Sequence, residues 1–186
     1  MNEIIDKIYR YIEQNNMLTD CERVVVGLSV GADSVCLLMV LKGYIERRRL
    51  QTELCAVHVN HGIRQEAGDD EEFARALCER MGVEFMAYHI DAAGLAKQLG
   101  MSVEEAGRKE RYRIFNEACK ECNARIAVAH HMNDQAETVL MNLSRGTSLK
   151  GIGGIRPVRD NIIRPLLSVT RAEVEEVLKS LNQPYV

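Results

Sequence analysis

Residues 23–34 read RVVVGLSVGADS, an apolar run followed by a loop of small residues. The apolar run predicts a short buried β-strand over residues 23–28, and the pattern from the end of the loop to about Arg49 predicts a helix. Small residues at 29–34 allow backbone N–H groups to turn inward to a phosphate, which also meets the positive end of the helix. The stretch therefore predicts an α/β domain with an anion-binding loop.

Three more strand and helix pairs follow this unit. We expect strands at residues 53–59, 83–90 and 125–129, with helices at 67–81, 102–122 and 134–143. An opening helix ends near Asn15, a short strand falls at 162–163, and Thr170 caps a last helix within about 170–181. This order predicts one domain over residues 1–186, a doubly wound, mainly parallel, five-stranded sheet with helices on both faces.

Composition excludes several classes of protein. With 186 residues, 46% hydrophobic and 27% charged, the chain is neither disordered nor a coiled coil. Its apolar runs are too short to span a membrane, and acids at Glu3 and Asp6 argue against a signal peptide, so we expect a cytoplasmic protein. The six cysteines are then expected to be reduced and mostly buried.

Charge is unevenly distributed despite a net value of −3. Residues 143–171 carry six basic side chains and one acid. We expect a basic loop at about 145–160 that faces a polyanion, with a solvated surface loop as the alternative.

The loop itself is not a Walker A motif, which requires a lysine, or a dinucleotide turn, which requires more glycines. Its pattern resembles the SGGxDS pyrophosphate loop of the N-type ATP pyrophosphatases; a tight turn with a serine cap is the alternative. Val30 replaces the second residue of that pattern, a glycine. A valine with positive φ costs roughly 1–2 kcal/mol, and we expect its branched carbons to lie beside the phosphate and weaken binding.

Further motifs narrow the resemblance. Residues 58–64 (HVNHGIR), 104–112 (EEAGRKERY) and 129–138 (AHHMNDQAET) resemble, in order, segments of the tRNA(Ile)-lysidine synthetases, as do 145–147, 151–157 and 164–167. Gly107 stands where that family has alanine. The resemblance implies an adenine nucleotide alpha hydrolase-like, Rossmann-like fold and an N-terminal catalytic domain, with the C-terminal tRNA-binding domains absent from this chain. A zinc site at His58 and His61 is a weaker interpretation, because nearby ligands do not complete four.

The resemblance also implies an activity. Lysine is joined to C2 of the wobble cytidine of tRNA(Ile) with anticodon CAU, through an adenylated cytidine, releasing pyrophosphate and AMP. The implied ligands are ATP, Mg²⁺, L-lysine and the tRNA; no membrane is involved, and a homodimer is left open.

Residue roles follow from the matching positions. The resemblance assigns ATP and pyrophosphate binding to Ser29, Val30, Gly31, Ala32, Asp33, Ser34 and His58, and catalysis to Asp33, Arg108, His130 and Asp134. It assigns Mg²⁺ to Asp33, lysine binding to Glu137, and tRNA contacts to Arg64, Arg145, Lys150 and Arg156.

Local alternatives accompany these roles. Asp33 is also suited to cap the following helix, and Arg108 is also placed to pair with Glu104. For His131 we favour a buried structural role.

Two other functions compete with this interpretation. Cys119 and Cys122 form a C-x-x-C pair, which suggests a tRNA-thiolating enzyme with an iron–sulfur cluster or zinc. Val30 and the short chain suggest a nucleotide-binding module without turnover.

Overall fold

Six strands form one sheet in the order β3-β2-β1-β4-β6-β5. The computed structural model describes residues 3–60, 67–120, 122–146 and 153–186. All neighbouring strands are parallel except β5, which runs antiparallel to β6. The strands are β1 (Arg23–Gly27), β2 (Glu53–Asn60), β3 (Glu84–His89), β4 (Ala124–Ala127), β5 (Val158–Arg159) and β6 (Ile162–Ile163).

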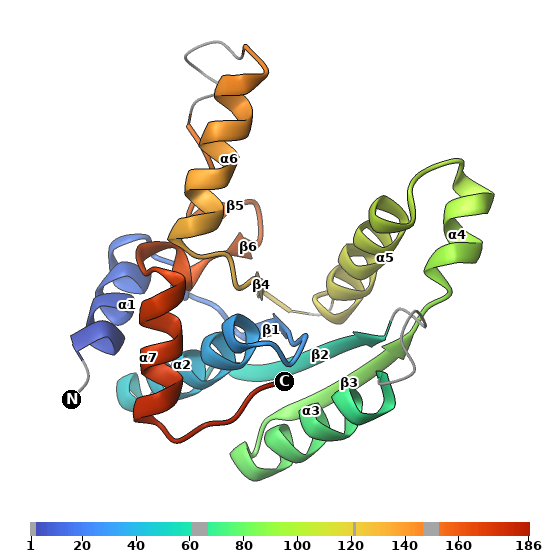
Figure 1. Cartoon of the computed structure of the whole chain (residues 1–186). Coiled ribbons are helices and arrows are strands. Elements are labelled where there is room, and N and C mark those ends of the chain that lie inside the picture. The colour runs from blue at the N-terminus through green and yellow to red at the C-terminus, as the bar shows by residue number, and fades with distance from the viewer. Residues whose placement is uncertain (1–2, 61–66, 121, 147–152) are drawn as a thin grey trace.

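Helices cover both faces of this sheet, as predicted (Figure 1). They are α1 (Glu3–Gln14), α2 (Ala32–Arg48), α3 (Ala67–Met81), α4 (Ala92–Leu99), α5 (Val103–Ala118), α6 (Met132–Ser144) and α7 (Arg171–Ser180), with a 3₁₀ helix η2 at Pro165–Ser168. The predicted fold class is confirmed, and the predicted count of five strands is wrong by one.

The additional strand is β5, which lies inside the segment predicted as a basic loop. Val158 pairs with Ile163 and Arg159 pairs with Ile162, so Asp160 and Asn161 form a two-residue turn. Asp160 has φ 55°, a value that Asp tolerates better than most residues because its short side chain can bond locally. The sequence analysis also did not identify α4. Asp91 caps this helix by accepting from the N–H of Gly94, and Gly100 ends it with φ 65°.

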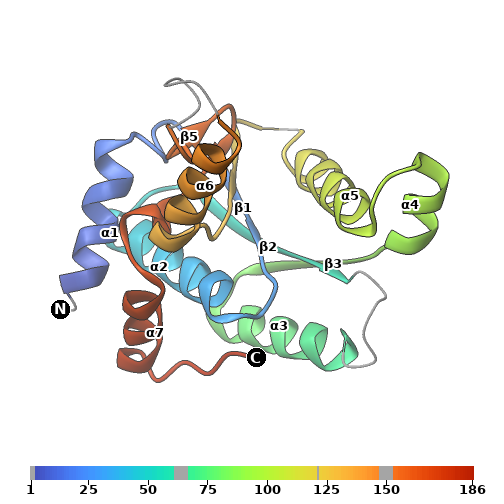
Figure 2. The same ribbon diagram turned by 45° about the horizontal axis from the view of Figure 1, so that its top comes forward.

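The valines of β1 divide the core into two layers. Val24 and Val26 are buried on one face, in the cluster that contains residues of α1, α2, α3 and α7. Val25 is buried on the other face, where Ile114 and Phe115 of α5 join it. Successive strand side chains point to opposite faces, so one apolar strand supplies both layers. Figure 2 shows α5 on the opposite side of the sheet from α2 and α7.

Strand order places a crevice beside β1. The chain runs from β1 outward to β2 and β3, and then returns to the other side of β1 to form β4. Open α/β sheets bind ligands at the carboxyl ends of strands where the order reverses in this way. The loop at residues 29–34 follows β1, and His130 follows β4, so both lie at this switch point.

Two arms and a returning tail complete the molecule. Helix α6 extends away from the sheet on one side, and the packed pair α4 and α5 extends on another (Figure 1). The last residues return to the loop after β1, where the N–H of Val186 donates to the carbonyl of Val30 at 3.1 Å. None of the helices in the described part of the chain is both long and apolar enough to cross a membrane.

Candidate nucleotide site

A cavity of about 620 Å³ opens at the switch point. The ends of β1 and β2 form its floor, the start of α2 and the segment after β4 form one wall, and α5 forms another. Its size lies within the range of small-molecule sites. Seven of the predicted site residues line it: Ser29, Asp33, Ser34, His58, Arg108, His130 and Asp134. Residues far apart in the sequence therefore meet in one place.

The loop after β1 is held in shape by Ser34. Its Oγ accepts from the Ser29 N–H at 3.1 Å, lies 3.2 Å from Ser29 Oγ, and donates to the Gly31 carbonyl at 3.0 Å. Gly31 is the N-cap residue of α2, without a side-chain cap. The first-turn N–H groups of a helix lack partners within the helix, so α2 offers donors and a positive end to an anion.

Val30 has φ 59° and is 1% exposed. This positive φ is a strained conformation for a β-branched residue. The expectation that the valine carbons lie beside the phosphate is wrong: the side chain belongs to the core cluster and does not line the cavity. Apolar burial on the inner side of the loop compensates for the strained backbone.

Asp33 forms an ion pair rather than a helix cap. Its Oδ2 accepts from Nη1 of Arg171, the first residue of α7. Its Oδ1 lies 3.7 Å from Nε2 of His131 and is buried without a hydrogen-bond partner. A buried carboxylate oxygen without a partner is costly unless a ligand supplies one, which makes this oxygen suited to a cation.

The fit to Mg²⁺ can be judged from this donor set. Among the described residues, no group of three or more His, Cys, Asp or Glu side chains could hold a metal ion. Mg²⁺ in nucleotide sites commonly takes one or two carboxylates and completes its shell with phosphates and water. One buried carboxylate oxygen beside a phosphate loop fits that pattern. The described residues do not form a metal site from protein ligands alone.

His58 lies on the floor of the cavity and is 5% exposed. Its Nδ1 lies 2.8 Å from the Leu28 carbonyl, which can only accept, so the ring carries its proton on Nδ1. Its Nε2 is then an acceptor. His61, the other member of the weaker zinc interpretation, falls outside the described residues.

Cations from α5 line the facing wall. Arg108 lies over the Tyr112 ring, 5.4 Å from its centroid, and none of the ion pairs between described residues joins it to Glu104. Arg111 lines the same cavity, and burial lowers its pKa. Ser102 and Glu105 form the capping box at the start of this helix. Helix α5 thus places two cations, Arg108 and Arg111, on the wall that faces the start of α2.

The segment after β4 contributes two histidines with different roles. His131 is buried and caps α6, because its Nδ1 accepts from the Asp134 N–H at 3.4 Å while Asp134 Oδ2 accepts from the His131 N–H at 2.8 Å. The preferred structural role of His131 is confirmed. His130 lines the cavity, and its Nδ1 accepts from Nε of Arg164 at 3.1 Å.

Several residues near the site were not identified from sequence. Arg164 donates a hydrogen bond to His130, and Arg171 donates one to Asp33. Three further residues line the cavity: Asn60, Asp70 and Phe115. Arg164 lies in the 164–167 motif, and its place in that motif was the only signal in the sequence. Arg171 gave no signal, because its contact with Asp33 spans 138 residues of sequence.

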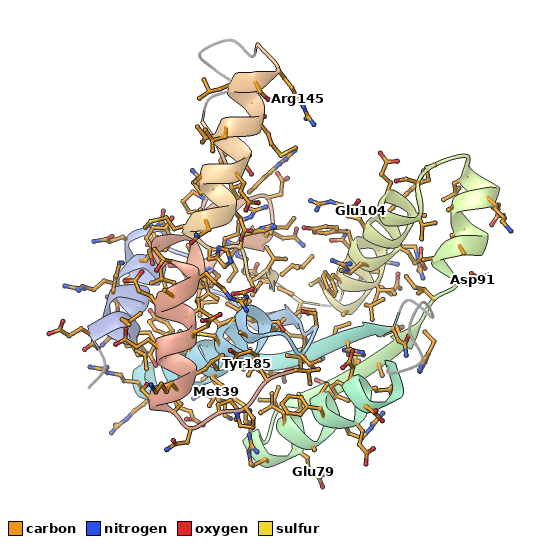
Figure 3. The ribbon with its side chains drawn as sticks, viewed as in Figure 1. Met39, Glu79, Asp91, Glu104, Arg145 and Tyr185 are labelled. Carbon is orange, nitrogen blue, oxygen red and sulfur yellow. The ribbon has the colours of Figure 1, made fainter. Side chains whose placement is uncertain are left out.

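Among the described residues predicted to bind lysine or tRNA, Glu137, Arg145 and Arg156 do not line this cavity. Glu137 is exposed on α6, one turn beyond Asp134, and does not line the cavity. Arg145 ends α6 at the far end of that arm, and Arg156 is exposed before β5 (Figure 3). Arg64 and Lys150 fall outside the described residues. The lysine and tRNA roles of these five residues stay predictions.

The cysteines are free. Four are buried as expected: Cys21, Cys36, Cys55 and Cys78. Cys119 and Cys122 lie between α5 and β4, at the amino ends of the strands and so at the edge opposite the cavity. Burial raises the pKa of Cys119 to about 11, with Cys122 as the next cause.

Comparison with known proteins assigns the family. A model of the PP-loop domain matches residues 2–186. The chain belongs to the PP-loop family. The cavity at the end of β1 therefore belongs to a PP-loop domain, and the assignment of residues 29–34 as the pyrophosphate loop stays a prediction.

Relatives of known name support the family resemblance that the motifs indicate. The PP-loop chain is 44% identical to the tRNA(Ile)-lysidine synthase of Caldanaerobacter subterraneus over 96% of its length, and 43% identical to that of Clostridium acetobutylicum over 93%. It spans about 38% of the length of each. The resemblance to the lysidine synthetases is confirmed.

A solved structure confirms the fold alone. The U34-tRNA thiolase from Methanococcus maripaludis, with its [4Fe-4S] cluster, has a TM-score of 0.79 and 24% identity; the match covers 99% of this chain and 65% of that one.

Proposed function

We propose that this chain is the ATP-using catalytic domain of a tRNA(Ile)-lysidine synthetase, acting in the cytoplasm. The single observation that carries the proposal is the cavity that brings the pyrophosphate loop, Arg108, His130 and Asp134 together. Relatives of this name match almost the whole chain at 43–44% identity.

The first step is adenylation of the wobble cytidine in the CAU anticodon. Cytidine O2 attacks the α-phosphorus of ATP, the bond from that phosphorus to the bridging oxygen breaks, and pyrophosphate leaves. Negative charge grows on the leaving group, where the N–H groups of α2 and the hydroxyls of Ser29 and Ser34 can stabilise it. Arg108 faces this loop across the cavity and supplies a planar cation for the α-phosphate.

Asp33 is the residue suited to hold Mg²⁺ with the phosphates. The ion would supply positive charge for the departing pyrophosphate. Arg171 pairs with Oδ2 of Asp33 and leaves Oδ1 for the ion.

The second step forms the new bond. The ε-amino group of lysine attacks C2, the bond from C2 to O2 breaks, AMP leaves with that oxygen, and the amine loses its surplus proton. Glu137, exposed on α6, is our candidate for binding the amino group, and Asp134 and His130 are placed for contacts to the adenylate. Arg145, directly after α6, and Arg156, before β5, are the described cations that we expect to meet RNA.

The experiment combines the chain with Mg-ATP, labelled lysine and an anticodon stem-loop RNA with a CAU anticodon. We expect pyrophosphate release and transfer of lysine to this RNA, and neither with a UAU anticodon. Arg108→Ala should reduce pyrophosphate release by at least tenfold. The matched control is Arg113→Ala on the same helix, because Arg113 pairs at the surface with Glu110 at 2.7 Å.

Pyrophosphate release that does not depend on the cytidine would contradict the proposed substrate. Equal losses in the two variants would contradict the role of Arg108. Sulfur transfer to the RNA, with bound iron, would favour the thiolating alternative instead.

A further inference from the structure

Arg164 is a buried arginine whose hydrogen bonds go to neutral acceptors. It is 7% exposed, donates from Nε to His130 Nδ1 at 3.1 Å, and donates from Nη1 to the Arg156 carbonyl at 2.8 Å. None of the ion pairs between described residues includes it. Burying a cation without a carboxylate is costly, so its place in the fold calls for an explanation.

Strand pairing brings Arg164 to His130. Ile163 of β6 pairs with Ala127 of β4, and the Val128 N–H donates to the Ile163 carbonyl at 3.1 Å. Arg164 directly follows β6, and His130 lies just beyond β4. The two side chains therefore leave the carboxyl ends of neighbouring parallel strands, which is where this sheet builds its site.

The chemistry of the contact defines the state of the imidazole. A guanidinium has N–H donors and no acceptor, and it stays protonated in proteins. A nitrogen that accepts from it must carry a lone pair, so His130 Nδ1 holds no proton. The ring is then neutral with its proton on Nε2, the nitrogen that Arg164 leaves for the cavity. His58 on the cavity floor has the opposite tautomer, because its Nδ1 donates to the Leu28 carbonyl.

We infer that Arg164 is a positioning residue that fixes His130 as the neutral Nε2–H tautomer, a permanent hydrogen-bond donor rather than an acid or base. The inference deepens the proposed function, because a phosphate oxygen of the bound nucleotide is the acceptor that such a donor fits. A neutral donor of this kind binds an anion without first having to take up a proton.

The surroundings of His130 favour the same state. Burial is the main cause that lowers its pKa, followed by the positive charge of Arg164; Arg108 and His131 act in the same direction, and Asp134 opposes them. These groups face the ring from η2, α5 and α6, and the net direction favours the neutral imidazole.

The test is nitrogen NMR of the histidine rings in the ¹⁵N-labelled chain without nucleotide. The His130 signals are assigned by their absence in His130→Gln. We expect the Nε2–H tautomer at pH 8, with imidazolium forming only below the ordinary range, and His58 gives the contrasting Nδ1–H tautomer at pH 8. A wild-type His130 that carries its proton on Nδ1, or becomes imidazolium at an ordinary pKa of about 6.5, would overturn the inference before any variant is made.

Variants then isolate Arg164. In Arg164→Met we expect mixed tautomers and a titration moved toward the ordinary range, whereas Arg113→Met, which removes an exposed cation from α5, should change neither. Arg164→Gln keeps an N–H donor without the charge and should retain most of the Nε2–H tautomer. Unchanged His130 signals in a folded Arg164→Met variant would show that the fold, and not this side chain, sets the tautomer.

Binding of Mg-ATP by calorimetry separates this inference from the proposed function. We expect about tenfold weaker binding in Arg164→Met, wild-type binding in Arg113→Met, and partial recovery in Arg164→Gln. If the wild-type chain does not bind ATP, the proposed function fails while the tautomer result stands. If it binds ATP and Arg164→Met binds equally well, the positioning role fails while the proposed function stands.

Discussion

At the scale of single residues, Val30 shows that a backbone angle and a side-chain direction are separate constraints. The angle is the left-handed one at which glycine is usual, and the side chain points to the core. A glycine at this position is therefore not required to make room for phosphate. It is required only to avoid strain, and buried valine carbons offset that strain.

Two substitutions at Val30 measure this balance. Val30→Gly and Val30→Ala both lose buried apolar surface, worth roughly 1.5–3 kcal/mol for a valine, so both should be less stable than wild type. Glycine alone relieves the strain of about 1–2 kcal/mol, less its entropy cost of about 0.5–1 kcal/mol. We expect Val30→Gly to be the more stable variant by up to about 1 kcal/mol in urea unfolding. The reverse order would show that the loop is not strained.

His130 gives a pH dependence whose sign can be worked out. Its pKa is lowered in the folded chain, mainly by burial, relative to an ordinary value of about 6.5. The unfolded chain therefore binds more protons, so this residue contributes stability above about pH 6.5 that is lost as pH falls through the folded pKa. We expect wild type to lose more stability than His130→Gln between pH 6.5 and 5, measured by thermal unfolding. Equal losses would contradict the lowered pKa.

At the scale of elements, a motif that adjoins a strand can contribute to the cavity only if it lies at the carboxyl end of that strand. The Cys119 and Cys122 pair precedes β4, whereas the cavity lies where the strands end. The sequence shows the pair but not which edge of the sheet it occupies. A pKa of about 11 also keeps the Cys119 thiol protonated at neutral pH.

The double variant Cys119→Ala with Cys122→Ala tests this separation. We expect pyrophosphate release within about twofold of wild type and no iron in either protein, measured by phosphate assay and metal analysis. In wild type, iodoacetamide should modify Cys119 slowly at pH 7.5. A loss of activity above tenfold, or iron lost with the cysteines, would restore the thiolating interpretation.

At the scale of the whole molecule, the arginines differ in whether an acidic side chain pairs with them. Arg145 ends α6, and Arg108 and Arg111 lie on α5, whereas Arg47 and Arg48 on α2 pair with Asp6 and Glu13. None of the ion pairs between described residues includes Arg108 or Arg145, so these two cations can meet a polyanion although the net charge of the chain is −3.

The salt dependence of RNA binding measures such contacts. Each neutralised phosphate contributes roughly 0.7–0.9 to the slope of log affinity against log salt. We expect Arg145→Ala with Arg156→Ala to reduce the slope for the anticodon stem-loop by about 1.5, while Arg47→Ala with Arg48→Ala leaves it unchanged. Equal effects from the two pairs would show that binding follows net charge alone.

Much of the fold could be predicted because apolar strands alternate with amphipathic helices in a regular order. Most of the cavity residues could be predicted because three of the motifs lie at the carboxyl ends of β1, β2 and β4, and parallel strands end at one edge, whereas Arg108 comes from α5. What could not be predicted depends on distant contacts: the ion pair of Arg171 with Asp33, the bond of Arg164 to His130, and the core-facing side chain of Val30. Local patterns carry no information on such pairs.

The return of the chain to the pyrophosphate loop has a practical consequence. Val186 bonds to Val30, and the neighbouring Tyr185 is 42% exposed (Figure 3). A fluorophore attached through Tyr185→Cys would sit beside the loop without replacing any group in the cavity. Its emission would report a nucleotide that binds beside the loop, so that one label follows occupancy in the variants described above.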